Sequence, residues 1–206
     1  MRTAYIFFAG MLFITITACS NSPSTLKVAG ESNIAATRNL ERDELVKRGN
    51  YLVTINTCGD CHSPKIMTPR GPVIDSTKIL SGHPANTTLP PIDPSALQPG
   101  QWGGMSPDIT AFAGPWGISY AANITPDSAT GIGAWTEEQF IKTMRTGKHL
   151  GAPNGRPILP PMPWQFIAKM TDEDLSAVYA YLKSIPPVSN KVPGPTPPNE
   201  VKLKKS

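Results

Sequence analysis

Cysteine is scarce in this chain: its 206 residues include three, Cys19, Cys58 and Cys61. Disulfides use cysteines in pairs, so an ordinary disulfide scheme would leave one over, and we expect another role for each. The apolar run at residues 5–17 is too short to span a bilayer comfortably. The chain therefore lacks the marks of a disulfide-stapled scaffold, and its apolar run suits an export signal better than a membrane-spanning helix.

A charge surplus of one sign is also missing from the body of the chain. Residues 38–186 contain thirteen Lys or Arg and thirteen Asp or Glu, so their formal charge is zero. The overall charge of +4 comes from the two ends, including Lys202, Lys204 and Lys205. A nucleic-acid-binding stripe has no support in this pattern, and we expect residues 188–206 to form a solvated Pro/Lys-rich tail.

Proline and glycine are abundant, with 23 and 17 residues against 39% apolar residues. Much of the backbone should therefore lie in turns and irregular loops. The length suits one domain with tails and does not demand a second core.

The N-terminus has the features of an export signal. Residues 1–18 hold a basic Arg2 and the apolar run, and they end at Ala18 before Cys19. This resembles the bacterial lipobox, in which the cysteine is lipidated, so we expect a lipoprotein signal peptide at 1–18. An uncleaved anchor, or a plain secretory signal with an incidental cysteine, is the alternative. Residues 19–39 are polar and without apolar period, which predicts a flexible tether.

The segment Cys58 to His62 has the C-x-x-C-H pattern of covalent haem attachment. Two thiols at this spacing bond the vinyl groups of one haem, and His62 becomes the proximal iron ligand. A thioredoxin-like redox pair and half of a zinc site are the alternatives. The redox pair would need a preceding buried strand, whereas residues 41–57 have a helical pattern, and zinc would need the distant His83 and His149.

Three helices are predicted. Apolar residues recur at helical spacing over 41–56, where Gly49 suggests close approach of another element. Thr136 and Gln139 form a capping box for a helix that ends at Gly147. A third helix follows Thr171 and stops before Pro186.

The iron also needs a sixth ligand. Met162 lies in the proline-rich stretch Leu159 to Trp164 between the second and third helices, and its rigid backbone suits a fixed ligand. Met67 is too near His62 in sequence to pass the porphyrin rim easily. The other candidates are Met105, Met144 and, for a bis-His site, His83 or His149.

These features together resemble class I cytochromes c, and in particular the haem domains in cytochrome subunits of periplasmic bacterial dehydrogenases such as the quinoprotein alcohol dehydrogenases. The resemblance covers residues 40–187 and includes Arg48 to Leu52, Asn123 to Trp135, Pro160 to Trp164 and the helix 172–182. It implies an all-α cytochrome c fold of three to five helices with long Pro/Gly-rich loops. It also implies one covalent haem c, with Met162 as axial ligand. Those subunits usually carry three haem motifs, whereas this sequence has one.

The stretch 63–134 has no clear helix and needs packing of its own. We expect its aromatic residues Trp102, Phe112, Trp116 and Tyr120 to lay it over the haem edge. A carbonyl of Pro69 or Pro72 is the expected acceptor for His62 Nδ1.

With both axial positions filled by protein, the expected function is electron transfer without catalysis at the side chains. The chain should be a membrane-tethered periplasmic carrier between a dehydrogenase or quinol-side donor and a terminal oxidase or other acceptor. The alternative is a haem protein with an open sixth site that acts in catalysis or gas binding.

Overall fold

The computed structural model describes residues 41–205. The predicted signal peptide at 1–18, the tether at 19–39 and Cys19 lie outside the described residues. The helical segments are a helix over residues 41–55, α2 (Cys58–His62), α3 (Glu137–Thr146), α4 (Trp164–Ile167) and α5 (Asp172–Ser184). Three short 3-10 turns lie at Pro94–Leu97, His149–Gly151 and Pro198–Glu200. Within 41–205 no helix has the length and apolar character needed to cross a membrane.

The three helices predicted from the sequence are confirmed. At the start of α3 the Thr136 hydroxyl accepts from the Gln139 N–H, and the Gln139 side chain accepts from the Thr136 N–H. Gly147 ends α3 at φ 66°, in the left-handed region where glycine has no Cβ penalty. Thr171 caps α5 through the Asp174 N–H.

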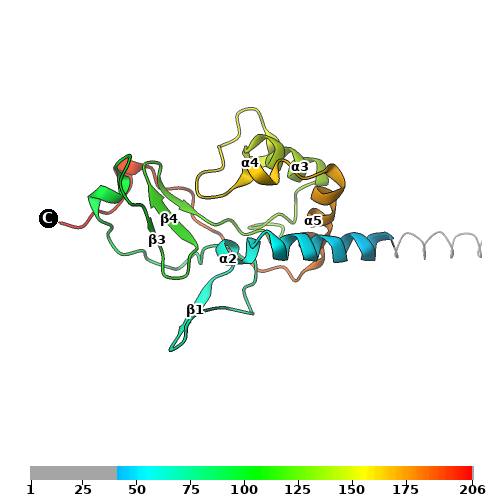
Figure 1. Cartoon of the computed structure of the whole chain (residues 1–206), viewed down its shortest axis with the longest axis horizontal. Coiled ribbons are helices and arrows are strands. Elements are labelled where there is room, and N and C mark those ends of the chain that lie inside the picture. The colour runs from blue at the N-terminus through cyan, green and yellow to red at the C-terminus, as the bar shows by residue number, and fades with distance from the viewer. Residues whose placement is uncertain (1–40, 206) are drawn as a thin grey trace, which may run out of the picture. The chain divides into compact units, whose positions relative to one another are not determined.

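The prediction of an all-α fold is only partly correct, because two small antiparallel sheets lie in the stretch that has no helix. One pairs β1 (Lys65–Thr68) with β2 (Gly71–Ile74), and the other has the order β3 (Gly104–Met105), β4 (Ala111–Gly114), β5 (Gly117–Tyr120). In Figure 1 the strands β3 and β4 lie together, apart from the group of α3, α4 and α5. These strands have two to four residues each, too few for an alternating pattern to be visible in sequence.

The main core lies among the helices. Its buried members are Val53, Leu80, Ile132, Phe140 and Leu182. The helix over 41–55 crosses α5 closely at Gly49: a Cβ there would lie 1.9 Å from the Ala177 carbonyl oxygen. The expected close approach at Gly49 is therefore confirmed.

A second, smaller core lies behind β4 and β5 and includes Ala111, Ala113, Ile118 and Val201. Val201 belongs to residues 188–206, for which the composition predicts a solvated tail. The backbone of that segment instead pairs with the domain, through an antiparallel bridge between Ile118 and Thr196 and a parallel bridge between Ile92 and Leu203. The terminal lysine side chains remain exposed. The lysine-rich composition predicts that these side chains are solvated. It carries no information about pairing through backbone atoms.

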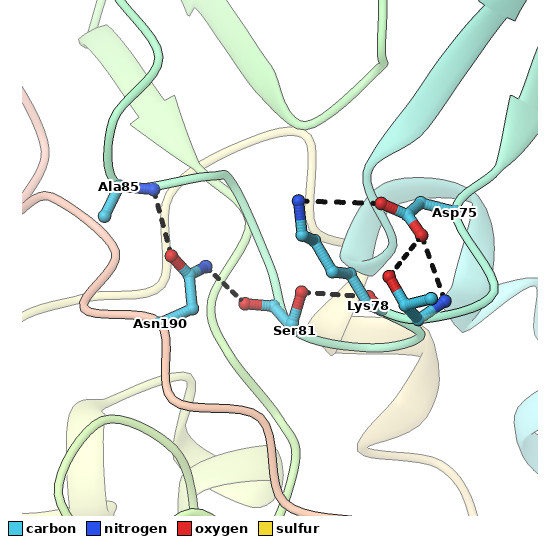
Figure 2. Close-up of polar contacts among 6 residues, drawn as sticks. Asp75, Lys78, Ser81, Ala85 and Asn190 are labelled. Atoms are coloured by element: carbon cyan, nitrogen blue, oxygen red, sulfur yellow. Dashed lines mark hydrogen bonds and ion pairs between the residues drawn. The ribbon is translucent and has the colours of Figure 1, made fainter.

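Asn190 fastens the same C-terminal segment to residues 81–85. Its Nδ2 donates to the carbonyls of Ser81 (2.7 Å) and His83 (2.9 Å), and its Oδ1 accepts from the Ala85 N–H at 2.9 Å. Figure 2 shows Asn190 between Ser81 and Ala85. One amide thus satisfies three backbone groups of a loop that is itself hydrogen-bonded to the haem motif, through the Gly82 N–H and the His62 carbonyl.

Candidate functional site

The haem motif forms the short helix α2. Thr57 precedes it in the left-handed region at φ 53°, and Cys58 and Cys61 are separated by one helical turn, so both thiols lie on the same side of α2. Both are free cysteines; Cys58 packs against the main core and Cys61 is half-buried. Burial raises the pKa of each thiol, an effect that Lys65 opposes at Cys61.

His62 is buried and its ring is fixed from one side. Its Nδ1 lies 2.7 Å from the carbonyl oxygen of Ala122. A carbonyl only accepts, so Nδ1 carries the proton, and Nε2 keeps its lone pair. Nε2 makes no hydrogen bond to any residue of 41–205. Burial lowers the pKa of His62, although the Ala122 hydrogen bond opposes this, so the imidazole is neutral and suited to bind a metal.

The acceptor for His62 corrects one prediction. The sequence favours the carbonyl of Pro69 or Pro72, but these residues belong to the hairpin of β1 and β2, where Pro72 pairs with Met67. The acceptor comes from Ala122, sixty residues after His62 and directly before the Asn123 to Trp135 stretch. A backbone carbonyl acceptor cannot be recognised from the type of its side chain. The only signal in the sequence is that Ala122 directly precedes the Asn123 to Trp135 stretch.

A second set of hydrogen bonds holds the chain around His62. The Gly82 N–H donates to the His62 carbonyl at 2.7 Å, and the Leu80 N–H donates to Ser63 Oγ at 2.9 Å. The His83 N–H donates to the Ala121 carbonyl at 2.9 Å. Residues 80–83 therefore connect α2 to the segment that orients the His62 ring.

Met162 lies in a loop that is fixed at both ends. The Ser119 hydroxyl on β5 donates to the Pro160 carbonyl at 2.5 Å, and the Trp164 N–H donates to the Met162 carbonyl at 2.9 Å. The Trp164 ring packs over Gly147 at the end of α3, where a Cβ would lie 2.4 Å from it.

β5 and the two residues after it thus serve both candidate ligands. Ser119 holds the loop of Met162, and three residues later the carbonyl of Ala122 holds His62. Three residues of extended chain span about 10 Å. Sequence reasoning missed Ser119 as well as Ala122, because a serine within a short strand has no distinguishing pattern.

The remaining methionines and histidines that the sequence offers as sixth ligand are packed in the core, exposed or in contact with other side chains. Met144 packs against the main core, as expected for a filler, and Met67 and Met105 are 61% and 66% exposed. His83 is buried with Nδ1 at 2.7 Å from Thr110 Oγ1, and the ring of His149 lies edge-on to Trp135 at 5.3 Å.

The four aromatic residues that the sequence predicts at the haem edge lie in different surroundings, and Phe112 is half-buried. Trp102 is 93% exposed, whereas Tyr120 packs against the second core. Trp116 is at the turn between β4 and β5, and its indole N–H is buried without a partner among the described residues.

The donor set fits haem c. Two free thiols on one side of a helix can form thioethers, and the next residue presents a neutral imidazole whose Nε2 is unused and whose Nδ1 is fixed by a carbonyl. In metal-binding histidines, a hydrogen bond from the ring nitrogen that does not bind the metal commonly fixes the tautomer.

Comparison with known proteins agrees with this chemistry. The family model described as Cytochrome c matches residues 46–186. The gluconate 2-dehydrogenase cytochrome c subunit of Pantoea cypripedii is 34% identical over 148 residues, 71% of this chain and 25% of the relative. The cytochrome c subunit of the quinone-dependent alcohol dehydrogenase of Gluconobacter oxydans is 29% identical over 154 residues, 73% of this chain and 24% of the relative.

A further relative is one of the subunits of the nicotinate dehydrogenase of Pseudomonas putida, which is 30% identical over 149 residues, 72% of this chain and 9% of the relative. The chain thus spans a quarter or less of the length of these three relatives.

Proposed function

Because the chain belongs to the cytochrome c family and carries covalently attached haem c, we propose that it is a membrane-tethered periplasmic electron carrier. The observation that carries the proposal is the bond between His62 Nδ1 and the Ala122 carbonyl at 2.7 Å. It leaves Nε2 as the one nitrogen of this ring free to bind iron. The carrier passes single electrons and catalyses no reaction at its own side chains.

The residues of the chain have distinct tasks in this function. Cys58 and Cys61 hold the cofactor covalently, and the Ala122 carbonyl keeps the His62 ring in one orientation as its proximal ligand. The haem supplies a one-electron couple between Fe(II) and Fe(III). Because Ala122 holds the ring rigidly, little rearrangement of the proximal side accompanies a change of charge.

Met162 is the proposed sixth ligand. It is supported by the half-buried position of Met162 and by the two attachments of its loop, at Ser119 and at Trp164. A thioether ligand raises the potential relative to a second histidine and leaves no position for substrate. Met144 and His83 are less suited, because the first fills the main core and the second is enclosed by the polypeptide.

The test of the carrier role is the visible spectrum of the reduced protein, recorded before and after addition of carbon monoxide at neutral pH. A six-coordinate carrier gives a sharp c-type spectrum that the gas does not change. A spectrum that shifts with carbon monoxide would reject the carrier and support the alternative, an open site for catalysis or gas binding.

The proposed location rests on the N-terminal sequence. Cys19 after Ala18 suits lipidation following removal of residues 1–18, and the segment 19–39 would tether the domain to the periplasmic face of a bacterial membrane. A Cys19→Ser protein has no thiol to lipidate and should not incorporate radiolabelled palmitate, whereas the wild type should. Absence of label in the wild type would contradict lipidation of Cys19.

The proposed partners follow from the relatives, two of which are cytochrome c subunits of gluconate and alcohol dehydrogenases. We propose that a dehydrogenase or a quinol-side donor reduces the haem and that a terminal oxidase or another acceptor oxidises it. Stopped-flow mixing of the oxidised protein with a reduced dehydrogenase of this kind measures the first step. Absence of reduction on the millisecond to second scale by any such donor would count against that assignment.

A further inference from the structure

Lys65 has an unusual set of contacts three residues after His62. Its Nζ donates to the carbonyls of Asp60, Ser63 (3.2 Å) and Asp108 (3.0 Å). An ammonium group has three N–H donors and no acceptor, so all three are used on backbone oxygens. The side chain therefore has one defined position and is half-buried there.

Two of these carbonyls lie at the C-terminal end of α2. In a longer helix the Asp60 carbonyl would accept from the N–H four residues later, but that residue is Pro64, which has no N–H. Lys65 supplies the missing donor and also satisfies the Ser63 carbonyl. A cation at this end of a helix is favourable with respect to the helix dipole. The ammonium thus stabilises the short helix that carries both thiols and His62.

The third carbonyl links α2 to the loop of Asp108. The carboxylate of Asp108 accepts from the hydroxyls of Ser106 and Thr110, so this loop is itself fixed. The carbonyl of Thr110 accepts from the Ala121 N–H at 2.8 Å, and the next residue, Ala122, binds His62. The contacts therefore form a closed circuit. Lys65 joins α2 to the loop of Asp108, and this loop is joined through Ala121 and Ala122 back to His62 of α2.

The ammonium group of Lys65 binds backbone carbonyls and no carboxylate, although Asp60 and Asp108 each carry one. Among residues 41–205 it takes part in no ion pair, unlike Lys47, which pairs with Glu44 at 2.8 Å. Oxidation of the iron adds one positive charge, and a fixed cation nearby disfavours that state, the more so where protein rather than water lies between them.

We propose that Lys65 is a positioning residue for the haem: it fixes α2 against the loop of Asp108, and its positive charge, held outside any ion pair, biases the iron towards the reduced state. The proposal deepens the proposed function by adding control of the potential. It depends on covalent haem at Cys58 and Cys61 and not on Met162 or Cys19. Carbon monoxide binding therefore tests the carrier role separately.

The experiment is redox titration of the haem-loaded protein with Lys65→Met, Lys65→Arg and Lys47→Met. Lys65→Met keeps the aliphatic stem but removes the charge, and we expect a lower potential than in the wild type. Lys65→Arg keeps the charge and should remain close to the wild-type potential. Lys47→Met makes the same change in net charge on an exposed helix face, and it should leave the potential unchanged.

The shift in Lys65→Met should persist at high salt, because a half-buried charge is screened less than an exposed one. If Lys65→Met does not retain haem, Lys65→Gln carries the same prediction, since its amide keeps hydrogen-bond donors. The proposal is overturned if Lys65→Met has the potential of Lys47→Met, or if Lys65→Arg falls as far as Lys65→Met. It is also overturned if neither neutral variant attaches haem, which would make Lys65 a folding residue.

Discussion

The helical region, residues 41–62 and 137–184, and the stranded region, residues 65–120 and 188–205, are held together in different ways. Large side chains such as Phe140 and Leu182 fill the helical core, and side-chain caps fix the starts of α3 and α5. The stranded region has a core that includes two alanines, and its chain segments are joined by backbone bridges and by polar side chains, above all Asn190.

This difference matters for the haem. The helical region supplies the thiols and His62, but the carbonyl that orients His62 follows β5 of the stranded region. The hydroxyl that holds the loop of Met162 also comes from β5. The stranded region, which has the weaker sequence pattern, therefore orients ligands that belong to the helical region.

The largest effect is expected in the helical region at Gly49. In Gly49→Ala the new Cβ would lie 1.9 Å from a backbone oxygen of α5, so the two helices must separate. We expect the free energy of unfolding to fall by about 3 kcal/mol, measured by denaturant titration. Gly104→Ala is the matched control, because its nearest neighbour would be 3.9 Å away and its effect should be small. Equal effects of the two substitutions would contradict the close crossing.

The stability of the stranded region should depend on the hydrogen bonds of Asn190. Asn190→Ala leaves the carbonyls of Ser81 and His83 and the N–H of Ala85 without their partner. We expect a loss of about 2 kcal/mol in the same titration. Asn199→Ala, at an exposed site in the same segment, should change stability little. No loss in Asn190→Ala would mean that these three hydrogen bonds add no stability.

The two regions also differ in how far the sequence predicts them. The helices at 41–55, 137–146 and 172–184 follow from apolar spacing and caps, and Cys58 to His62 follows from its motif. Each of these signals consists of side chains close together in sequence.

The strands, the C-terminal pairing and the Ala122 carbonyl have no such signal. They depend on backbone atoms that are far apart in sequence, such as His62 and Ala122 or Ile118 and Thr196. Lys65 is an intermediate case: Pro64 leaves the Asp60 carbonyl without a helical donor, a gap that the sequence shows, but the contact with Asp108 appears only in the fold.

A smaller effect is expected at the cap of α3. Thr136→Ala removes the hydroxyl that accepts from the Gln139 N–H, and we expect a loss of about 1 kcal/mol by thermal or denaturant unfolding. Thr136→Ser keeps the hydroxyl and should retain most of the stability. If serine is as damaging as alanine, the capping bond is not the cause.

The smallest effect should be a pH dependence from His83. Burial lowers the pKa of His83, although Asp108 opposes this shift, so the folded chain binds the proton less readily than the unfolded chain. The unfolded chain takes up a proton near the ordinary pKa of 6.5, and the free energy of unfolding therefore falls as the pH drops through this value. His83→Gln should make the pH profile between 7 and about 5 flatter. A profile as steep as that of the wild type would exclude His83 as a cause.

The most direct test of the account is the comparison of Met162→Ala with Met105→Ala, by redox titration and by carbon monoxide binding to the reduced protein. Met105 is exposed, and its removal should change neither property. The account predicts that Met162→Ala keeps its covalent haem, has a lower potential and binds carbon monoxide at neutral pH. A Met162→Ala protein with wild-type potential and no carbon monoxide binding would contradict the assignment of Met162 as the sixth ligand.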